Sequence, residues 1–115
     1  MAKEHLHSAR PRPSIDDRGL SETARLLAAL GDPERLRLLD LMSGEEVCVS
    51  QLAEVTGAAM TTVSQRLKVL RERGLVMVRR DGKHMYYRLA DGHVGDLVRI
   101  GLAHALEIEG GRSDS

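Results

Sequence analysis

The sequence predicts a mainly α-helical domain that carries one β-hairpin. Apolar residues recur at helical spacing in several segments, which are bounded by Asp-Pro or glycine signals. The pair Asp81-Gly82 separates two segments rich in β-branched, aromatic and other apolar residues, as is typical of a two-residue hairpin turn. A longer helical segment over residues 91–109 follows. The predicted order is therefore helices, a hairpin and a final helix.

Length and composition limit the classes of protein to which the chain can belong. Its 115 residues are 42% hydrophobic, enough for one domain, but they include no Phe or Trp, so the core must be aliphatic. The single cysteine, Cys48, excludes an internal disulfide framework. The first residues hold no apolar signal region, and no apolar run is long enough to span a membrane. We expect a soluble, cytoplasmic protein without a membrane partner.

The chain divides into three parts. Residues 1–19 hold two of the three prolines and little periodicity, which predicts a mobile N-terminal arm containing His5 and His7. Residues 20–109 form the predicted domain, and residues 110–115 a disordered tail.

Two short helices open the domain. Ser21 is a candidate N-cap for a helix that ends before Gly31. Its apolar stripe consists of Leu20, Ala24, Leu27 and Ala28. Asp32-Pro33 is a second start signal, with Asp at the N-cap and Pro at the first helical position. The helix that follows, over residues 33–42, is expected to turn inward Leu36, Leu39 and Met42.

A short helix, a turn and a longer helix come next. Residues 51–55 form the short helix, Thr56-Gly57 the turn, and residues 60–73 the longer helix, which stops at Gly74. One face of the longer helix is apolar, with Val63, Leu67 and Leu70. Its other face is polar and basic. This succession is typical of a helix-turn-helix, and the hairpin after it then serves as a wing.

The charges are segregated although the net charge is zero. Residues 61–90 carry eight Lys and Arg against two Asp and Glu, whereas the segments on either side are both net negative. Such a basic segment is either a solvated helix and hairpin or the electrostatic footprint of a DNA-binding surface. Its position on a polar-faced helix and a wing favours double-stranded DNA as the partner.

The recognition helix offers candidate contacts to DNA bases in its first turns. Gln pairs with adenine, and Ser or Thr with several bases, so the candidates for base contacts are Thr61, Thr62, Ser64 and Gln65. Basic side chains on the helix and the wing are candidates for phosphate contacts: Arg66, Lys68, Arg79, Arg80 and Lys83. A dimer with two such helices would bind an inverted-repeat operator.

The final helix contains candidate metal ligands at both ends. His93 and His104 are eleven residues apart and therefore share one helical face, with Glu107 on the same side. Asp91 stands at the N-cap. Taken singly, Asp91 is a helix cap and each histidine a surface or packed side chain. The joint spacing of the four residues favours a metal site.

Geometry requires a second chain to complete that site. Eleven residues of helix span about 16 Å, whereas zinc binds its ligands at about 2 Å. Asp91 and His93 therefore cannot share an ion with His104 and Glu107 of the same helix. Two antiparallel helices about a two-fold axis would form two identical sites. The sequence thus predicts a symmetric homodimer through its first and last helices. If the last helix is instead buried within a monomer, each half-site is only a pair of ligands.

Two imidazoles and two carboxylates suit tetrahedral zinc. Cobalt or nickel is the alternative. Either ion would prefer more than these four ligands, and His5 and His7 in the arm would supply the additional ones. Soft ions fit poorly because the site has no thiolate.

The residues described above resemble the ArsR/SmtB family of metal-sensing winged-helix repressors. The resemblance covers roughly residues 21–107, through the segments ALGDPERLRLLDLM, EEVCVSQLAEVTG, TTVSQRLKVLRERGLV, RRDGKHMYYRL and DGHVGDLVRIGLAHALE. The last segment is similar to the zinc-sensing branch, and Asp91, His93, His104 and Glu107 each match a ligand of its motif.

The resemblance implies a mechanism. The metal-free dimer binds the operator of a metal efflux or storage gene, and metal between the two last helices releases it. It further implies that His104 hydrogen-bonds a carbonyl near the end of the recognition helix, so that metal and DNA each weaken the binding of the other.

The chain departs from the family at Cys48-Val49-Ser50, where some members carry two cysteines. Gln51 also stands where a second metal site of the family has Asp. Cys48 with His5 or His7 is at best a weak site, and we expect an inert, half-buried thiol.

Three other functions stay open. The first is a winged-helix regulator with a non-metal effector or with Cys48 as a redox sensor. The second is a small zinc hydrolase that uses His93, His104 and Glu107, although the sequence favours no enzyme. The third is a metal-buffering or protein-interaction domain, against which the basic wing argues.

Overall fold

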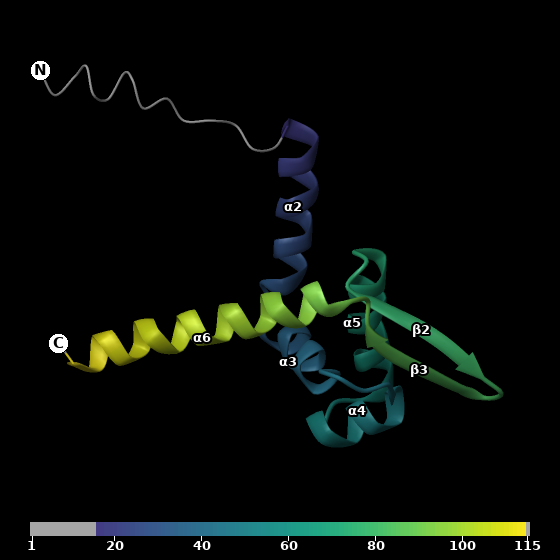
Figure 1. Cartoon of the computed structure of the whole chain (residues 1–115). Helices are drawn as coiled ribbons and strands as arrows, with labels where there is room; N and C mark the ends of the chain where they lie inside the picture. Colours follow the sequence, from purple (N-terminus) through teal and green to yellow (C-terminus); the bar gives the residue numbers. More distant parts are fainter. Residues whose placement is uncertain (1–15, 115) are drawn as a thin grey trace, which may run out of the picture.

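The computed structural model describes residues 16–114, so the predicted arm with His5 and His7 lies outside the described residues except for residues 16–19. The elements are α2 (Asp17–Leu30), α3 (Pro33–Leu41), β1 (Val47–Cys48), α4 (Val49–Thr56), α5 (Met60–Glu72), β2 (Val76–Asp81), β3 (His84–Leu89) and α6 (Gly92–Asp114). Helices α3, α4 and α5 gather beside the β2–β3 hairpin, while α2 and the C-terminal half of α6 project away from them (Figure 1).

The ends of α2 and α6 differ from the predicted ones. The carboxylate of Asp16 accepts a hydrogen bond from the Gly19 amide at 2.8 Å, so α2 begins at Asp17 and the predicted N-cap at Ser21 is wrong. Asp satisfies the free amides of a first turn at least as well as Ser, which places Ser21 inside the helix. At the other end α6 continues to Asp114 rather than ending at Glu109, because no proline stops the propagation of hydrogen bonds.

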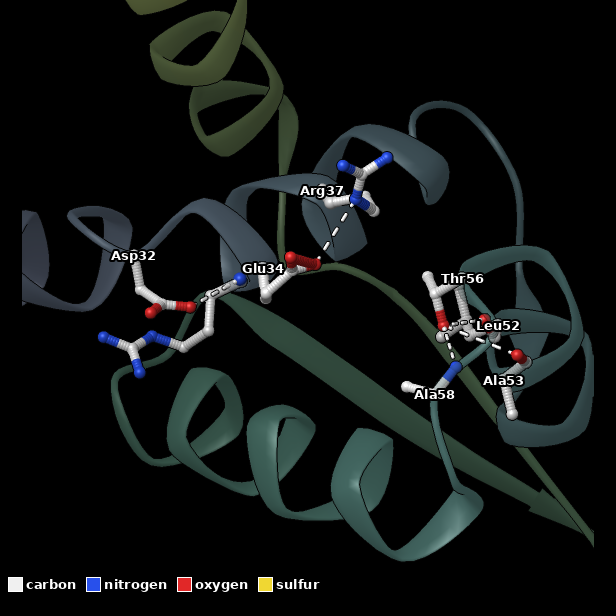
Figure 2. A network of polar contacts seen from close by, with 8 residues as sticks. Asp32, Glu34, Arg37, Leu52, Ala53, Thr56 and Ala58 are labelled. Carbon is white, nitrogen blue, oxygen red and sulfur yellow. Dashed lines mark hydrogen bonds and ion pairs between the residues drawn. The ribbon is translucent and has the colours of Figure 1, made fainter.

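Helix α3 is fixed to α2 by polar contacts at their junction. Asp32 caps α3 through the Arg35 amide at 2.9 Å, as the Asp-Pro signal predicted (Figure 2). The Arg35 guanidinium in turn donates to the carbonyls of Ala29 at 2.7 Å and Ala28 at 3.3 Å. These carbonyls belong to the last turn of α2, where the Ala28 carbonyl also accepts from the Gly31 amide at 3.1 Å. One arginine therefore closes the end of α2 against the start of α3.

The core is aliphatic, as predicted. Its fully buried large side chains are Leu38, Leu39, Met42, Leu52, Val63, Leu67, Leu70, Leu75 and Val76. The prediction for α5 is confirmed at all three apolar positions. In α3 the inward residue Leu38 was missed, and Leu36 is only partly buried against the core.

The helix-turn-helix is held by its turn. Gly57 follows α4 with φ of 76°, a left-handed conformation that glycine adopts at no steric cost. The hydroxyl of Thr56 donates back to the carbonyl of Leu52 at 2.7 Å and accepts from the Ala58 amide at 3.4 Å (Figure 2). These contacts set the angle at which α5 leaves α4.

The wing belongs to a three-stranded antiparallel sheet in the order β1-β3-β2. Asp81 pairs with His84, so the hairpin loop is Gly82-Lys83 and the predicted turn at Asp81-Gly82 is displaced by one residue. Gly82 has φ of 63°, as the first position of a type II′ turn requires. Strand β1 was not predicted, because its two residues are too short for a sequence signal.

Candidate metal half-sites and nucleic-acid interface

The first candidate half-site lies where α6 begins. The Asp91 carboxylate accepts from the His93 amide at 2.9 Å, which is the capping contact expected at a helix start. The same oxygen, Oδ1, lies 3.3 Å from Nδ1 of His93, and the His93 side chain is 92% exposed. A carboxylate has about four lone-pair positions, so capping leaves Asp91 able to bind an ion.

The second candidate half-site lies farther along the same helix. Nδ1 of His104 is 3.8 Å from Oε2 of Glu107, one turn further on. Both side chains are more than two thirds exposed, at 72% for His104 and 81% for Glu107. Their spacing of three residues places them on adjacent positions of one helical face.

The donors in each pair fit a common ion. Two ligands bound at about 2 Å to a tetrahedral zinc lie about 3.3 Å apart. The separations of 3.3 Å and 3.8 Å are close to this value, and both pairs consist of an imidazole and a carboxylate. Within the described residues no three or more His, Cys, Asp or Glu side chains gather into a metal site. Each pair on one chain is therefore only half of a tetrahedral site.

The surface around the half-sites is apolar and uncovered in a single chain. On α6 the exposed large apolar side chains are Leu97, Ile100, Leu102, Leu106 and Ile108. On α2 they are Leu20 and Leu27, two members of the predicted apolar stripe. At about 100° per residue, Leu97, Ile100 and Ile108 lie on the same side of α6 as His93 and His104, and we call these three apolar residues the apolar face. An exposed apolar surface on two projecting helices is typical of an interface between subunits.

The structure does not contain the hydrogen bond expected from His104 to the recognition helix. Helix α6 packs on α3 and β3, and the polar neighbour of His104 within residues 16–114 is Glu107 of its own helix. Residues 99–111 of α6 are all exposed in one chain and project away from α5 (Figure 1), so this contact stays a prediction for the metal-bound dimer.

The predicted base-contacting residues lie along the first turns of α5. Thr61, Ser64 and Gln65 are exposed, and Thr62 is half-buried. Of the predicted phosphate contacts on this helix, Lys68 is exposed and Arg66 is half-buried. The opposite side of α5 is fixed in the core by Val63 and Leu67. The polar face of α5 is therefore presented outward by a rigid helix.

The basic residues of the wing are not equivalent. Arg79 is held by Glu46 in a salt bridge of 2.9 Å between Nη2 and Oε1, whereas no ion pair is found for Arg80 or Lys83 among the described residues. Hydrogen bonding to Glu46 raises the pKa of Arg79, and the same contact lowers the pKa of Glu46. Arg80 and Lys83 are exposed near the hairpin tip and remain the better candidates for phosphate contacts.

Cys48 has a polar environment at the start of α4. It is half-buried, and its Sγ lies 3.1 Å from the hydroxyl of Ser50. The Ser50 hydroxyl, followed by the Gln51 amide, lowers the pKa of the thiol. A thiol with a lowered pKa is more reactive than an ordinary one.

A short helix, a glycine turn and an outward polar helix beside a basic hairpin define a winged helix-turn-helix DNA-binding domain. The chain belongs to the arsR family of bacterial regulatory proteins, whose family model matches residues 32–78. Family membership places it with transcriptional regulators rather than with hydrolases.

Relatives in sequence support this assignment over most of the chain. The chain is 35% identical to the HTH-type transcriptional regulator NmtR of Mycobacterium tuberculosis, over 91% of this chain and 88% of that protein. It is 41% identical to the transcriptional repressor SmtB homolog of Synechocystis sp., over 75% of this chain and 65% of that protein.

A solved structure has the same fold. The homodimeric winged helix-turn-helix DNA-binding domain of a possible ArsR-family transcriptional regulator from Mycobacterium bovis superposes with a TM-score of 0.76. It is 35% identical and aligns with 85% of this chain and 91% of that one. In the part of the chain that the structure describes, no helix is long and apolar enough to cross a membrane.

Proposed function

We propose that the chain is a metal-responsive transcriptional repressor that acts as a homodimer. The proposal rests on one observation: the four candidate ligands lie in two pairs at separate positions along the exposed helix α6, with Asp91 and His93 in one pair and His104 and Glu107 in the other. Each pair holds an imidazole and a carboxylate at a spacing that fits one ion, and neither pair is a complete site.

A two-fold dimer completes both sites at once. When two α6 helices lie antiparallel, Asp91 and His93 of one chain meet His104 and Glu107 of its partner. The same packing covers the apolar face, which supplies the free energy of association. The homodimeric state of the Mycobacterium bovis domain supports this arrangement.

The metal-free dimer presents two recognition helices to an inverted-repeat operator. Gln65, Ser64 and their neighbours on α5 read bases, while Arg80 and Lys83 of the wing bind phosphates. Metal between the two α6 helices fixes one relative orientation of the subunits. If this orientation does not match the half-site spacing, metal and DNA compete by linkage, and repression ends.

Zinc fits the donor set best, and cobalt or nickel is the alternative. Four nitrogen and oxygen donors suit tetrahedral zinc, and no thiolate is present that would favour a soft ion. The controlled gene on this proposal is one for metal efflux or storage.

A subunit-mixing experiment tests whether the sites are shared between chains. The variants His93→Ala and His104→Ala each break both sites of their own homodimer. In a mixed dimer of the two variants, one site contains both mutations and the other contains neither. We expect each homodimer to lose tight zinc binding and each mixed dimer to regain one of its two sites. In an equimolar mixture about half of the dimers are mixed, so the sample regains about a quarter of the wild-type zinc. No recovery on mixing would contradict a site built from two chains.

One alternative retains the DNA-binding domain but places the effector at Cys48. The lowered pKa of this thiol favours it. On this alternative Cys48→Ser abolishes the response to oxidant, and His104→Ala does not change regulation.

A further inference from the structure

A cavity of about 200 Å³ lies between the recognition helix and the wing. It is lined by the end of β1 with the start of α4, by the first turns of α5, and by the hairpin loop with the beginning of the wing strand β3. The residues that line it include Cys48, Ser50, Met60, Ser64, Lys83 and His84. Strand β1 pairs with β3, and Cys48 lies opposite Tyr86. This pairing places Cys48, and Ser50 after it, beside the wing.

The lining of this cavity suits an anion. Hydroxyl groups come from α4 and α5, and an ammonium and an imidazole come from the wing, so hydrogen-bond donors converge from three sides. No acidic residue lines it. Ser50 is the second residue of α4, where the free amides of the helix start add partial positive charge.

We propose that this cavity holds one backbone phosphate of the operator DNA. The proposal rests on the DNA-binding function stated above. In helix-turn-helix complexes the recognition helix enters the major groove while the preceding helix crosses the backbone. With the wing on the other side, the sugar-phosphate strand that borders the groove must pass between α5 and β3, where the cavity opens. Ser50 and His84 are thereby assigned as phosphate contacts in addition to Lys83.

The bound phosphate is coupled to the state of Cys48. The Ser50 hydroxyl carries one proton, and it either donates to the Cys48 sulfur or donates to the phosphate. A phosphate in the cavity is also a second negative charge beside the thiolate. Operator binding therefore favours the neutral, less reactive thiol and covers it at the same time.

Cys48 is the one cysteine of the chain, so it reports on the cavity without background. The experiment measures the rate at which iodoacetamide, a neutral reagent, alkylates the wild-type protein. The rate is compared for free protein, for protein saturated with operator, and for protein with a scrambled duplex or with inorganic phosphate. Operator occupancy is measured in the same samples by fluorescence anisotropy.

We expect saturating operator to slow alkylation by about tenfold or more, because it both covers the thiol and lowers its ionised fraction. The scrambled duplex, at a salt concentration where it does not bind, and inorganic phosphate leave the rate unchanged. Operator binding with an unchanged alkylation rate would overturn the phosphate site but leave the repressor function standing. Absence of operator binding would overturn both.

Two variants separate a phosphate contact from a general effect of charge. Ser50→Ala removes a neutral donor and is expected to weaken operator binding by about tenfold, a normal loss for a hydrogen bond to a charged group, without changing its salt dependence. Arg88→Gln is the control: Arg88 is on the same strand as His84, but it donates to the Leu89 carbonyl outside the cavity. Equal losses for the two variants would contradict a specific site.

Discussion

Arg79 on β2 reaches across the middle strand of the sheet to Glu46, which stands just before β1. Its guanidinium lies over the ring of Tyr86 on β3, 4.9 Å from the ring centroid, and makes bonds of 2.9 and 3.1 Å to the carboxylate oxygens. Arg79 and Cys48 both pair with Tyr86 in the sheet, so the side chain of Arg79 spans all three strands. This contact connects the wing with the segment that leads into the helix-turn-helix.

The connection predicts different roles for neighbouring arginines of the wing. A cation that neutralises one DNA phosphate contributes about 0.9 to the slope of log affinity against log salt concentration. Arg80→Ala or Lys83→Ala is expected to lower the slope by about that amount, whereas Arg79→Ala leaves it nearly unchanged. Operator titrations at several salt concentrations measure this. An equal decrease for Arg79→Ala would show that Arg79 leaves Glu46 to bind phosphate.

The same ion pair makes the stability of the wing depend on pH. Hydrogen bonding to Arg79 lowers the pKa of Glu46 below its ordinary value of 4.5 in the folded chain. The stabilisation is therefore fully present above that ordinary value and is lost as the pH falls through the lower folded value. Glu46→Gln is expected to lower Tm slightly at pH 7 and by less at pH 3, which is below the ordinary pKa of the carboxyl. The same difference at both pH values would exclude an ionic contribution.

The apolar face predicts how the dimer is broken. Ile100 of α6 is 67% exposed in one chain, and on the proposed dimer its side chain is covered by the partner. Ile100→Asp buries a charge in that interface and is expected to give monomers at micromolar concentration. Val55→Asp is the matched control, because Val55 is 68% exposed but lies on α4, outside the apolar face. Sedimentation velocity distinguishes the two, and a dimeric Ile100→Asp variant would place the interface elsewhere.

Asp91 has two roles that a single substitution separates. Its carboxylate accepts the His93 amide at the start of α6, and Asn caps a helix about as well as Asp. Asp91→Asn is therefore expected to leave Tm within about 1 °C of the wild type while it weakens zinc binding at least tenfold, because a neutral amide is a poor zinc ligand. Asp91→Ala should lose both properties. Unchanged zinc affinity in the Asn variant would show that Asp91 is a cap alone.

Local signals in the sequence predicted much of this fold. Asp32-Pro33 marked a helix start, and the spacing of Val63, Leu67 and Leu70 identified the buried face of α5, because both depend on residues close in the chain. The candidate ligand pairs of α6 were likewise visible as spacing within one helix. The structure places their nitrogen and oxygen atoms 3.3 and 3.8 Å apart, and metal binding by them stays a prediction.

The remaining features depend on contacts between distant residues. Glu46 and Arg79 are 33 positions apart, so no local pattern indicated that this arginine is already paired. The hairpin turn was displaced by one residue because the register follows the pairing of two whole strands, and not the Asp81-Gly82 pair alone. Ser21 was the predicted cap of the first helix, whereas in the folded chain Asp16 caps it.

Operator affinity with and without metal tests the central proposal most directly. Fluorescence anisotropy is measured on an inverted repeat taken from beside the gene of this protein, first with chelator and then with zinc, cobalt or nickel. The account predicts tight binding in chelator and a loss of affinity with zinc of about tenfold or more, within the range of known allosteric couplings. His104→Ala should bind as tightly in chelator and lose none of its affinity with zinc. Tight operator binding that every metal leaves unchanged would contradict metal sensing by the last helix.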